Sequence, residues 1–446
     1  MKIRMHYGKS GLDINLPDAW DVTVIKKPEM PVLSDPVSTL RDNLNHPVGS
    51  LPLKELVKGK RTICIAICDI TRPVPNGTLL PVLIEEIMKA GINKDAITLL
   101  IATGLHGPNK GEELREVVGD RWVIDNIKVI NHFARADKDH LFLGRTGSGI
   151  PIKLDRHFIE ADVRVVVGLV EPHFMAGYSG GRKVVTPGIA HEDTIRSIHA
   201  PFLLEKPCVD NCIIDGNPLN EILIEIVQMV GECYAVNTVI DEGRRISFIN
   251  FGDIVKSHLE AVAFSRPFFE IPVKERFRVV LTSGAGYPLD KNYYQTVKGM
   301  IAPLNILEPG GDLFIVSHCS EGIGSDDFCI SQKRLLDMGV DKFMDAIKDK
   351  KYAEIDEWET EMLVKAMKVA RISLYSTGIS DTEKPLTGVH AISELKDLQE
   401  ALANSVNCLE EKKIAVVPEG PYVIPLYERE NLISMTHKEK RLWCIP

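Results

Sequence analysis

Buried apolar strands alternate with amphipathic helices along the first half of the chain, and this order limits the folds open to it. Residues 61–69 (RTICIAICD), 96–104 (AITLLIATG) and 163–170 (VRVVVGLV) are short apolar runs typical of strands covered on both faces. Helical patterns follow at 78–91, which ends at a glycine, and at 186–200, which has a proline in its first turn. This β-α-β order predicts an α/β fold with a mostly parallel sheet and helices on both faces.

The chain is too long for one ordinary core, so we expect two domains. It has 446 residues, and a second strand and helix unit follows a proline-marked stretch, with a predicted strand at 277–288 and a helix at 293–304. We therefore predict two domains, 1–270 and 271–420, each a mostly parallel sheet flanked by helices. The tail, at about 420–446, is a candidate for return to the first domain.

The net charge of −9 argues against a nucleic-acid-binding protein. Charged residues make up 26% of the chain, which is typical of a soluble globular enzyme. Residues 1–16 lack the apolar segment of a secretion signal, and no window approaches the length of an uninterrupted apolar membrane span. We therefore expect a cytoplasmic protein with no membrane partner.

The nine cysteines are scattered along the chain and do not form a clear metal-binding pattern. Cys64 and Cys68 lie in the first predicted strand, and their spacing is wider than is usual for structural zinc sites. They are predicted to be buried thiols in a reducing compartment.

Three predicted strands end in loops that carry polar and ionisable side chains. In an open α/β sheet, ligands bind beyond the carboxyl ends of the strands, where the loops are free to vary. The three loops therefore place an acid, an arginine, two histidines and a lysine along one edge of one sheet. These loop residues are Asp69, Thr71, Arg72, His106, His173 and Lys183.

The third loop is rich in glycine but matches neither of the two familiar phosphate-binding patterns. Counted from Gly177, Arg182 stands where a P-loop requires glycine, and the later stretch SGAGYPL has leucine where a dinucleotide fingerprint requires glycine. What remains is a compact loop whose backbone amides, around Gly180 and Gly181, are suited to an anion. A lysine held there, Lys183, is suited to covalent attachment of a cofactor.

Two histidines on neighbouring loops indicate acid–base chemistry. A racemase needs a proton donor or acceptor on each face of its prochiral centre, and imidazole serves both roles near neutral pH. His106 and His173 follow neighbouring strands and are expected to flank a substrate. His191 and His199 are eight residues apart, about two helical turns, so they share one face, and one of the pair is a candidate metal ligand.

Four motifs in these regions, taken together and in this order, resemble the nickel-dependent lactate racemase family of nickel-pincer 2-hydroxyacid racemases and epimerases. The resemblance covers most of the chain, from about residue 60 to 320. Trp358 and the late PEGPYVIP segment also fit it. The four motifs are DITRPVPN (69–76), TGLHGPN (103–109), EPHFMAGYSGGRKVVTPGIA (171–190) and DKNYYQTVKGM (290–300).

The resemblance implies a nickel-pincer nucleotide, which is a pyridinium-3,5-bisthiocarboxylic acid mononucleotide that holds nickel and is tethered to a lysine through a thioamide. Lys183 matches the tethering lysine, and His199 matches the histidine that completes the nickel coordination. His106 and His173 match the two acid–base histidines. Further positions match residues around the cofactor and the substrate; these are Asp69, Thr71, Arg72, Tyr294, Gln295, Lys298 and Trp358.

In the mechanism implied by the family, one histidine removes the hydroxyl proton of the substrate while the C2 hydride moves to the cofactor, which gives a 2-keto acid. The keto acid rotates and the hydride returns to its other face, where the second histidine serves the opposite antipode. Arg72 and Lys298 would balance the charge of a carboxylate or phosphate. The prediction is a racemase or epimerase of lactate or a related 2-hydroxyacid, with its active site in the cleft between two domains and a cofactor loaded by separate biosynthetic enzymes.

Two residues depart from the pattern of family members that act on lactate. Phe174 follows the histidine where a small residue is usual, and Arg182 precedes the lysine where a glycine is usual. Arg182 is a candidate to meet the nucleotide phosphate or a second substrate carboxylate. These departures leave malate, sugar acids and longer hydroxyacids open as substrates.

Two other functions are compatible with the same residues. A zinc-dependent hydrolase or lyase would use His106, His173 and His199 as metal ligands. A non-catalytic member of the fold would bind a nucleotide or a hydroxyacid as a sensor. The sequence does not indicate an oligomeric state.

Overall fold

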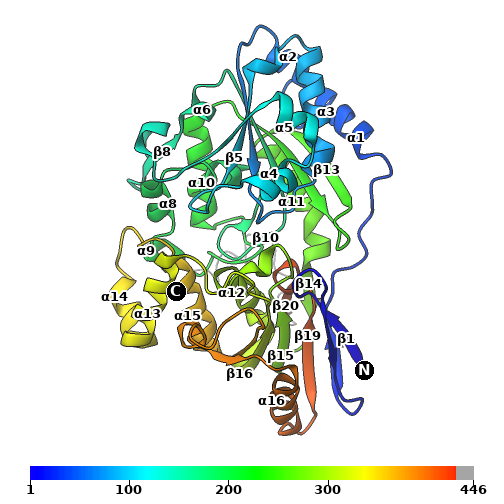
Figure 1. Ribbon diagram of the computed structural model, residues 1–446, viewed down its shortest axis with the longest axis vertical. Helices are drawn as coiled ribbons and strands as arrows, with labels where there is room; N and C mark the ends of the chain where they lie inside the picture. Colours follow the sequence, from blue (N-terminus) through cyan, green and yellow to red (C-terminus); the bar gives the residue numbers. More distant parts are fainter. Residues whose placement is uncertain (428–446) are drawn as a thin grey trace.

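The structure, a computed structural model, describes residues 1–427 and consists of two α/β units stacked along the long axis of the molecule (Figure 1). The first unit is built on a six-stranded sheet in the order β13-β12-β9-β4-β5-β6, in which only β13 is antiparallel to its neighbour. Its strands are β4 (Ile63–Cys68), β5 (Ile97–Ala102), β6 (Lys128–Asn131), β9 (Val163–Leu169), β12 (Tyr234–Ile240) and β13 (Ile246–Asp253).

Helices cover the first sheet because its strands are apolar on both faces. In β9, for example, every residue except Arg164 is buried. The helices of this unit are α1 (Pro36–Asn45), α2 (Leu53–Val57), α3 (Asn76–Lys89), α4 (Gly111–Val118), α5 (Arg121–Asn126), α6 (Arg156–Ile159), α7 (Arg182–Val185), α8 (Glu192–Ile198), α9 (Pro201–Leu204), α10 (Pro218–Val230) and α11 (Lys256–Phe269). Two hairpins complete it: β7 (His140–Arg145) with β8 (Pro151–Asp155), and β10 (Pro172–His173) with β11 (Gly177–Tyr178).

The second unit contains a six-stranded, wholly parallel sheet in the order β18-β17-β16-β15-β19-β3. Its strands are β3 (Asp21–Val24), β15 (Phe277–Ser283), β16 (Leu307–Val316), β17 (Ala370–Tyr375), β18 (His390–Ile392) and β19 (Lys413–Val417). Its helices are α12 (Tyr293–Ile301), α13 (Asp326–Met338), α14 (Val340–Ile347), α15 (Glu357–Val369) and α16 (Leu395–Asn407). Two small sheets join β1 (Lys2–Met5) to β2 (Leu12–Asn15) and β14 (Glu270–Val273) to β20 (Ile424–Tyr427).

The predicted fold class is confirmed: two helix-flanked, mostly parallel sheets form two α/β units. The start of the chain differs from the predicted division, because β3 lies beside β19 in the second sheet and the β1–β2 hairpin shares a core with β15. A four-residue strand such as β3 gives no indication of which sheet it joins, since its partner is far away in sequence. The boundary at residue 270 stays a prediction.

The end of the chain is described only in part. Strand β20 pairs in parallel with β14, close to the predicted boundary between the domains. The rest of the predicted returning tail, 428–446, lies outside the described residues.

The predicted helix at 186–200 is wrong in its first half. The chain turns from Thr186 to Ala190, and α8 begins only after His191, whose Nδ1 accepts a hydrogen bond from the Asp193 N–H at 3.2 Å. Pro187 has no N–H to donate and Gly188 follows it, so this stretch forms a turn instead of a helix.

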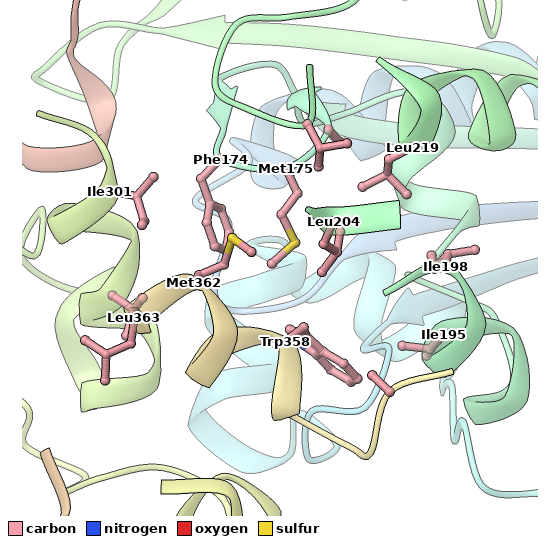
Figure 2. Packing of buried hydrophobic residues seen from close by; sticks show 14 of the residues in the cluster. Phe174, Met175, Ile195, Ile198, Leu204, Leu219, Ile301, Trp358, Met362 and Leu363 are labelled. Atoms are coloured by element: carbon pink, nitrogen blue, oxygen red, sulfur yellow. The ribbon is translucent and has the colours of Figure 1, made fainter. Parts of the chain in front are cut away.

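The two units share one continuous apolar core. Figure 2 shows Met362 and Leu363 of α15 and Ile301 of α12 on one side, with Phe174 and Met175 of the first unit on the other. These side chains belong to a single cluster of buried residues, so side chains from both units surround the site described below. Within residues 1–427, no helix has the length and apolar character that crossing a bilayer requires.

Candidate active site

The carboxyl ends of β9, β4 and β5, three adjacent parallel strands, open into a cavity of about 170 Å³ between the two units. A second cavity of about 320 Å³ adjoins it and shares part of its wall. Most of the predicted site residues are brought together here: those lining the first cavity are Asp69, Thr71, Arg72, His106, His173, Gly180, Lys183, His199, Tyr294, Lys298 and Trp358.

Two predicted site residues are placed differently. Gln295 lines the second cavity, and its Oε1 accepts a hydrogen bond from the Lys298 ammonium group. Gly181 lines neither of these two cavities. It precedes α7 with a φ of 46°, and a Cβ on it would come within 2.8 Å of the His258 ring. Its small size is therefore needed for packing against His258.

His106 is held by a buried carboxylate. Its Nδ1 lies 2.6 Å from Asp69 Oδ2, while the other carboxylate oxygen of Asp69 accepts a hydrogen bond of 2.6 Å from the Thr71 hydroxyl. Burial opposes the charged form of Asp69, but His106, Thr71 and Arg72 outweigh it and hold the pKa of Asp69 below its usual value. An ionised Asp69 requires the proton of His106 on Nδ1, which leaves Nε2 as a base.

His173 is held as the opposite neutral tautomer, with its ring proton on Nε2. Its Nδ1 accepts hydrogen bonds of 3.2 Å from the backbone N–H groups of Met175 and Ala176, within the β10–β11 hairpin. A neutral ring that accepts at Nδ1 carries its proton on Nε2. Burial, together with the positive charge of Lys183 and Arg72, holds the pKa of His173 well below its usual value, so the ring is neutral near pH 7.

Lys183 lies on α7, immediately after the glycine-rich turn, where it is half-buried and lines the cavity. Burial and the nearby cations Arg72, Lys298 and Arg182 lower the pKa of its amine from 10.5 to about 7. No ion pair or hydrogen bond of the Lys183 side chain occurs within residues 1–427. A neutral amine is a nucleophile, so the lowered pKa makes Lys183 suitable for covalent attachment of a cofactor.

This property predicts a distinctive labelling profile for Lys183 in cofactor-free protein. A neutral amine is acylated and a protonated one is not, so trace acetylation of Lys183 should rise with a midpoint near pH 7. Roughly one tenth of the amine is neutral one pH unit below that midpoint. Lys413 is the internal control, because Glu411 and Glu275 raise its pKa to about 12. Peptide mass spectrometry across the pH range reads both, and a Lys183 midpoint near 10 would contradict the account.

His199 forms the end of α8 and stacks on Trp358 of α15, with ring centroids 4.6 Å apart. Its Nδ1–H donates to the Ile195 carbonyl at 2.8 Å, so its Nε2 is unprotonated and available as a ligand. Burial, with the charge of Lys183, lowers the pKa of His199 to about 3. On the other side, the Trp358 indole N–H donates to the Tyr294 hydroxyl at 2.9 Å. Figure 2 shows Trp358 reaching from α15 toward α8.

Arg72 comes from the first unit and Lys298 from the second, and each of these cations lies near a buried acidic side chain. The Nε of Arg72 is 3.1 Å from Glu171 Oε1. Burial lowers the pKa of Lys298 and raises that of Glu359, while the attraction between the two opposes both shifts. Sequence reasoning missed Glu171, Glu359 and also Asp356, which lines both cavities. The only indication in the sequence was their position: Asp356 and Glu359 lie close to Trp358, and Glu171 lies two residues before His173. Acidic side chains at such positions are usually exposed to solvent.

Arg182 does not serve the role considered for it. Its guanidinium group is buried between Asn220 Oδ1, 2.7 Å from Nε, and His258 Nδ1, 2.9 Å from the Nη1 group, and it lies outside the cavity walls. It therefore contacts no anion in the cavity. Phe174, by contrast, does line the cavity, and the Lys298 ammonium group lies 5.8 Å from its ring centroid.

No three His, Cys, Asp or Glu side chains within residues 1–427 come together as a metal-binding group. His106, His173 and His199 line one cavity, but they are not gathered as three ligands of one ion. His191 is buried and lies 3.1 Å from Asp137, outside the cavity. This arrangement does not support the zinc-enzyme alternative.

Comparison with known proteins identifies the family. Models of the lactate racemase N-terminal domain and the lactate racemase C-terminal domain match residues 7–208 and 273–425. The lactate racemase of Thermoanaerobacterium thermosaccharolyticum is 30% identical over 430 residues, which cover 95% of this chain and 98% of that protein. The chain belongs to the lactate racemase family. Its members named in these comparisons are isomerases, so the protein is a racemase, and the non-catalytic alternative is not supported.

Two further similarities agree with this membership of the lactate racemase family. The lactate racemase of Lactiplantibacillus plantarum is 30% identical over 393 residues, covering 86% of this chain and 90% of that protein. The structure of the T. thermosaccharolyticum lactate racemase apoprotein superposes with a TM-score of 0.85 and 29% identity, covering 95% of this chain and 100% of that one. A Thermotoga maritima protein shares the fold, with a TM-score of 0.69 and 17% identity over 88% of this chain and 98% of its own.

Proposed function

We propose that the protein inverts C2 of a 2-hydroxyacid, lactate or a related acid, with a nickel-pincer nucleotide tethered to Lys183. The observation that carries this proposal is one cavity lined by an amine whose pKa is lowered to about 7 and by two histidines that are opposite tautomers. A racemase needs both a proton acceptor and a proton donor in each turnover. The relatives named lactate racemase support the same reaction class.

The residues present fit this cofactor. Lys183 offers an amine for the thioamide, and the unprotonated Nε2 of His199 offers one ligand for nickel. One histidine ligand is what a metal needs when an organic group supplies its other donors, and no three-residue metal group lies within residues 1–427. When bound, the group supplies an acceptor that takes the C2 hydride and returns it. Separate biosynthetic enzymes would load it, and we expect this to occur in the cytoplasm.

The side chains of the cavity bind the substrate and transfer the hydroxyl proton. Arg72 and Lys298 attract the substrate carboxylate or the cofactor phosphate. His106 takes the hydroxyl proton on Nε2, and Asp69 stabilises the imidazolium that results. His173 donates a hydrogen bond from its Nε2–H to the substrate oxygen, and it can transfer that proton only once Nδ1 has gained one, because a neutral ring that lost it would be an imidazolate anion. To act as a base it must first move its proton to Nδ1, which breaks the hydrogen bonds from Met175 and Ala176.

The role of Asp69 leads to a specific prediction. In Asp69→Asn the amide can donate to His106 Nδ1, which moves the ring proton to Nε2 and removes the base. We expect kcat to fall by roughly 10⁴-fold, as in other Asp–His pairs where the tautomer is lost. The measurement is racemisation by cofactor-loaded variant, with circular dichroism to check its folding.

Asp155→Asn is the matched control for that variant. Asp155 pairs with His132 at 3.3 Å in the first unit, also buried but away from the cavity. Its kcat should stay at the wild-type value. Equal losses in the two variants would show that Asp69 contributes only to folding.

The proposed function is tested by antipode interconversion with and without cofactor. Protein coexpressed with the cofactor-biosynthesis enzymes should convert one antipode of lactate or another 2-hydroxyacid into the other, and protein made without them should not. Racemisation by protein shown by mass to be unmodified would contradict the tethered cofactor. Loaded protein that inverts no 2-hydroxyacid would contradict the reaction class.

A further inference from the structure

The first turn of α15 and the residue before it bring two acidic side chains into the wall of the active-site cavity. Glu359 lines the main cavity, and Asp356 lines both the main cavity and the adjoining one. Neither has a role in the proton transfers or the cofactor attachment proposed above. Their carboxyl groups add hydrogen-bond acceptor oxygens to a cavity that must also hold the carboxylate of the substrate.

Glu359 is a buried group with an unfilled hydrogen-bonding position. Its side chain belongs to a residue that is only 1% exposed, and its Oε1 has no partner within the described part of the chain. A buried carboxyl oxygen without a partner destabilises the folded protein, and more so if the carboxyl group is charged. Because Glu359 lines the cavity, a hydroxyl of a bound ligand is a suitable partner for this carboxyl group.

Asp356 is held in place at the junction of the two cavities. Its backbone is left-handed, with a φ of 60°, and the Ser325 hydroxyl donates a hydrogen bond to its Oδ2. The carboxylate does not cap its own helix, although it precedes α15. A non-glycine residue in this conformation beside a ligand cavity is typical of a functional position. The adjoining cavity of about 320 Å³ gives room for a substrate longer than three carbons.

The charge balance of the cavity favours one substrate carboxylate and disfavours two. The cations of the cavity wall are Arg72, Lys298 and, when it is protonated, Lys183. Arg72 is already paired with Glu171, and attachment of a cofactor would remove the charge of Lys183. A second carboxylate would have no free cation, which is costly in a buried site.

We propose that the natural substrate is a monocarboxylic 2-hydroxyacid that carries further hydroxyl groups, an acid of the aldonate class, whose distal hydroxyls donate to Glu359 and Asp356. This inference rests on the proposed function and names its substrate class. Inversion at C2 leaves the composition of such an acid unchanged, so no further reactant is needed. Lactate fills less of the space, and malate brings a second negative charge.

The test is a substrate comparison with cofactor-loaded protein. D-Gluconate, both antipodes of lactate and both antipodes of malate are assayed for inversion at C2 by chiral chromatography. We expect kcat/KM for gluconate to exceed that for lactate at least about tenfold, because a site built to bind hydroxyls rejects analogues that lack them, and malate to be the poorest. Lactate or malate turned over as well as gluconate would overturn the substrate class while leaving the racemase function intact. Turnover of none of the three acids would overturn the substrate class, and the proposed function would fail with it.

Two variants separate a binding role of Glu359 from a purely structural one. Glu359→Gln keeps an acceptor oxygen, and Glu359→Leu removes it at similar volume. In the leucine variant the ratio of kcat/KM for gluconate over lactate should fall at least about tenfold through KM, and glutamine should restore most of it. An unchanged ratio in the leucine variant would overturn the assignment. If the leucine variant does not fold, the glutamine variant provides the test. A wild-type KM for both lactate and gluconate at every pH from 6 to 9 in Glu359→Gln would also overturn the assignment.

Discussion

Replacing Lys183 by alanine is expected to abolish racemisation and to leave the protein without a covalent cofactor. Lys183 lines the cavity, and its lowered pKa of about 7 makes its amine a nucleophile under physiological conditions. Without the tether, the cofactor loses the advantage of an intramolecular reactant, so activity should fall by roughly 10³-fold or more. Intact-protein mass after coexpression with the biosynthetic enzymes reads the attachment, and racemisation of the same sample reads the activity.

Lys298→Ala is the matched control for the tether. Lys298 lines the same cavity and also has a lowered pKa, but it comes from α12 of the second unit and its ammonium group donates to Gln295. This variant should keep the added mass and the nickel while losing activity through weaker binding of the substrate carboxylate. If the added mass is retained in Lys183→Ala and lost in Lys298→Ala, the cofactor is attached to Lys298 and the assignment to Lys183 is wrong.

Replacing either histidine is expected to have the second large effect. His106→Asn and His173→Asn should each lower kcat/KM by roughly 10²- to 10⁴-fold, which is the usual contribution of a positioned acid or base. The loss must be equal in both directions, because the equilibrium between two antipodes cannot depend on the enzyme. Steady-state racemisation alone therefore cannot assign one histidine to one antipode.

Single turnovers can make that assignment. Formation of the 2-keto acid from each antipode, trapped by rapid quenching, should be lost for one antipode in His106→Asn and for the other in His173→Asn. In the wild-type protein the antipode served by His106 should react faster, because His173 must release its hydrogen bonds from Met175 and Ala176 before it becomes a base. If both variants lose the same antipode, the two histidines do not serve opposite faces.

The sequence allowed the fold class and the core of the cavity to be predicted, for a physical reason. Buried parallel strands have a recognisable apolar pattern, and the loops at their carboxyl ends meet at one edge, so Asp69, His106 and His173 were predicted to lie together. The structure places all three, with Lys183, around one cavity. The resemblance to the family supplied Tyr294, Lys298 and Trp358 from the second unit.

What the sequence did not reveal depended on contacts between distant segments. The burial of Glu359 and Asp356 follows from the way α15 packs against α12 and α13, and acids on a helix normally face solvent. Arg182 was considered as an anion-binding group, but its partners, Asn220 and His258, lie 38 and 76 residues away in sequence. Strand β3 joins the second sheet for a similar reason, since its partner β19 lies near the other end of the described chain.

The orientation of the two imidazoles also required the structure. A sequence places His106 and His173 at strand ends but does not indicate which ring nitrogen is bonded. The Asp69 carboxylate and the two backbone N–H groups of the β10–β11 hairpin fix opposite proton positions in the two rings. This asymmetry is the property that the single-turnover experiment measures.

The central claim is that the histidines move only the hydroxyl proton while the C2 hydrogen travels as a hydride and never exchanges with water. The most direct measurement is racemisation of a protiated 2-hydroxyacid by cofactor-loaded protein in D₂O, with mass spectrometry of the product antipode after less than one tenth of the reaction, roughly the initial-rate regime. The account predicts a product that retains protium at C2. Deuterium at C2 would show that a base removes that hydrogen as a proton, and it would contradict the account.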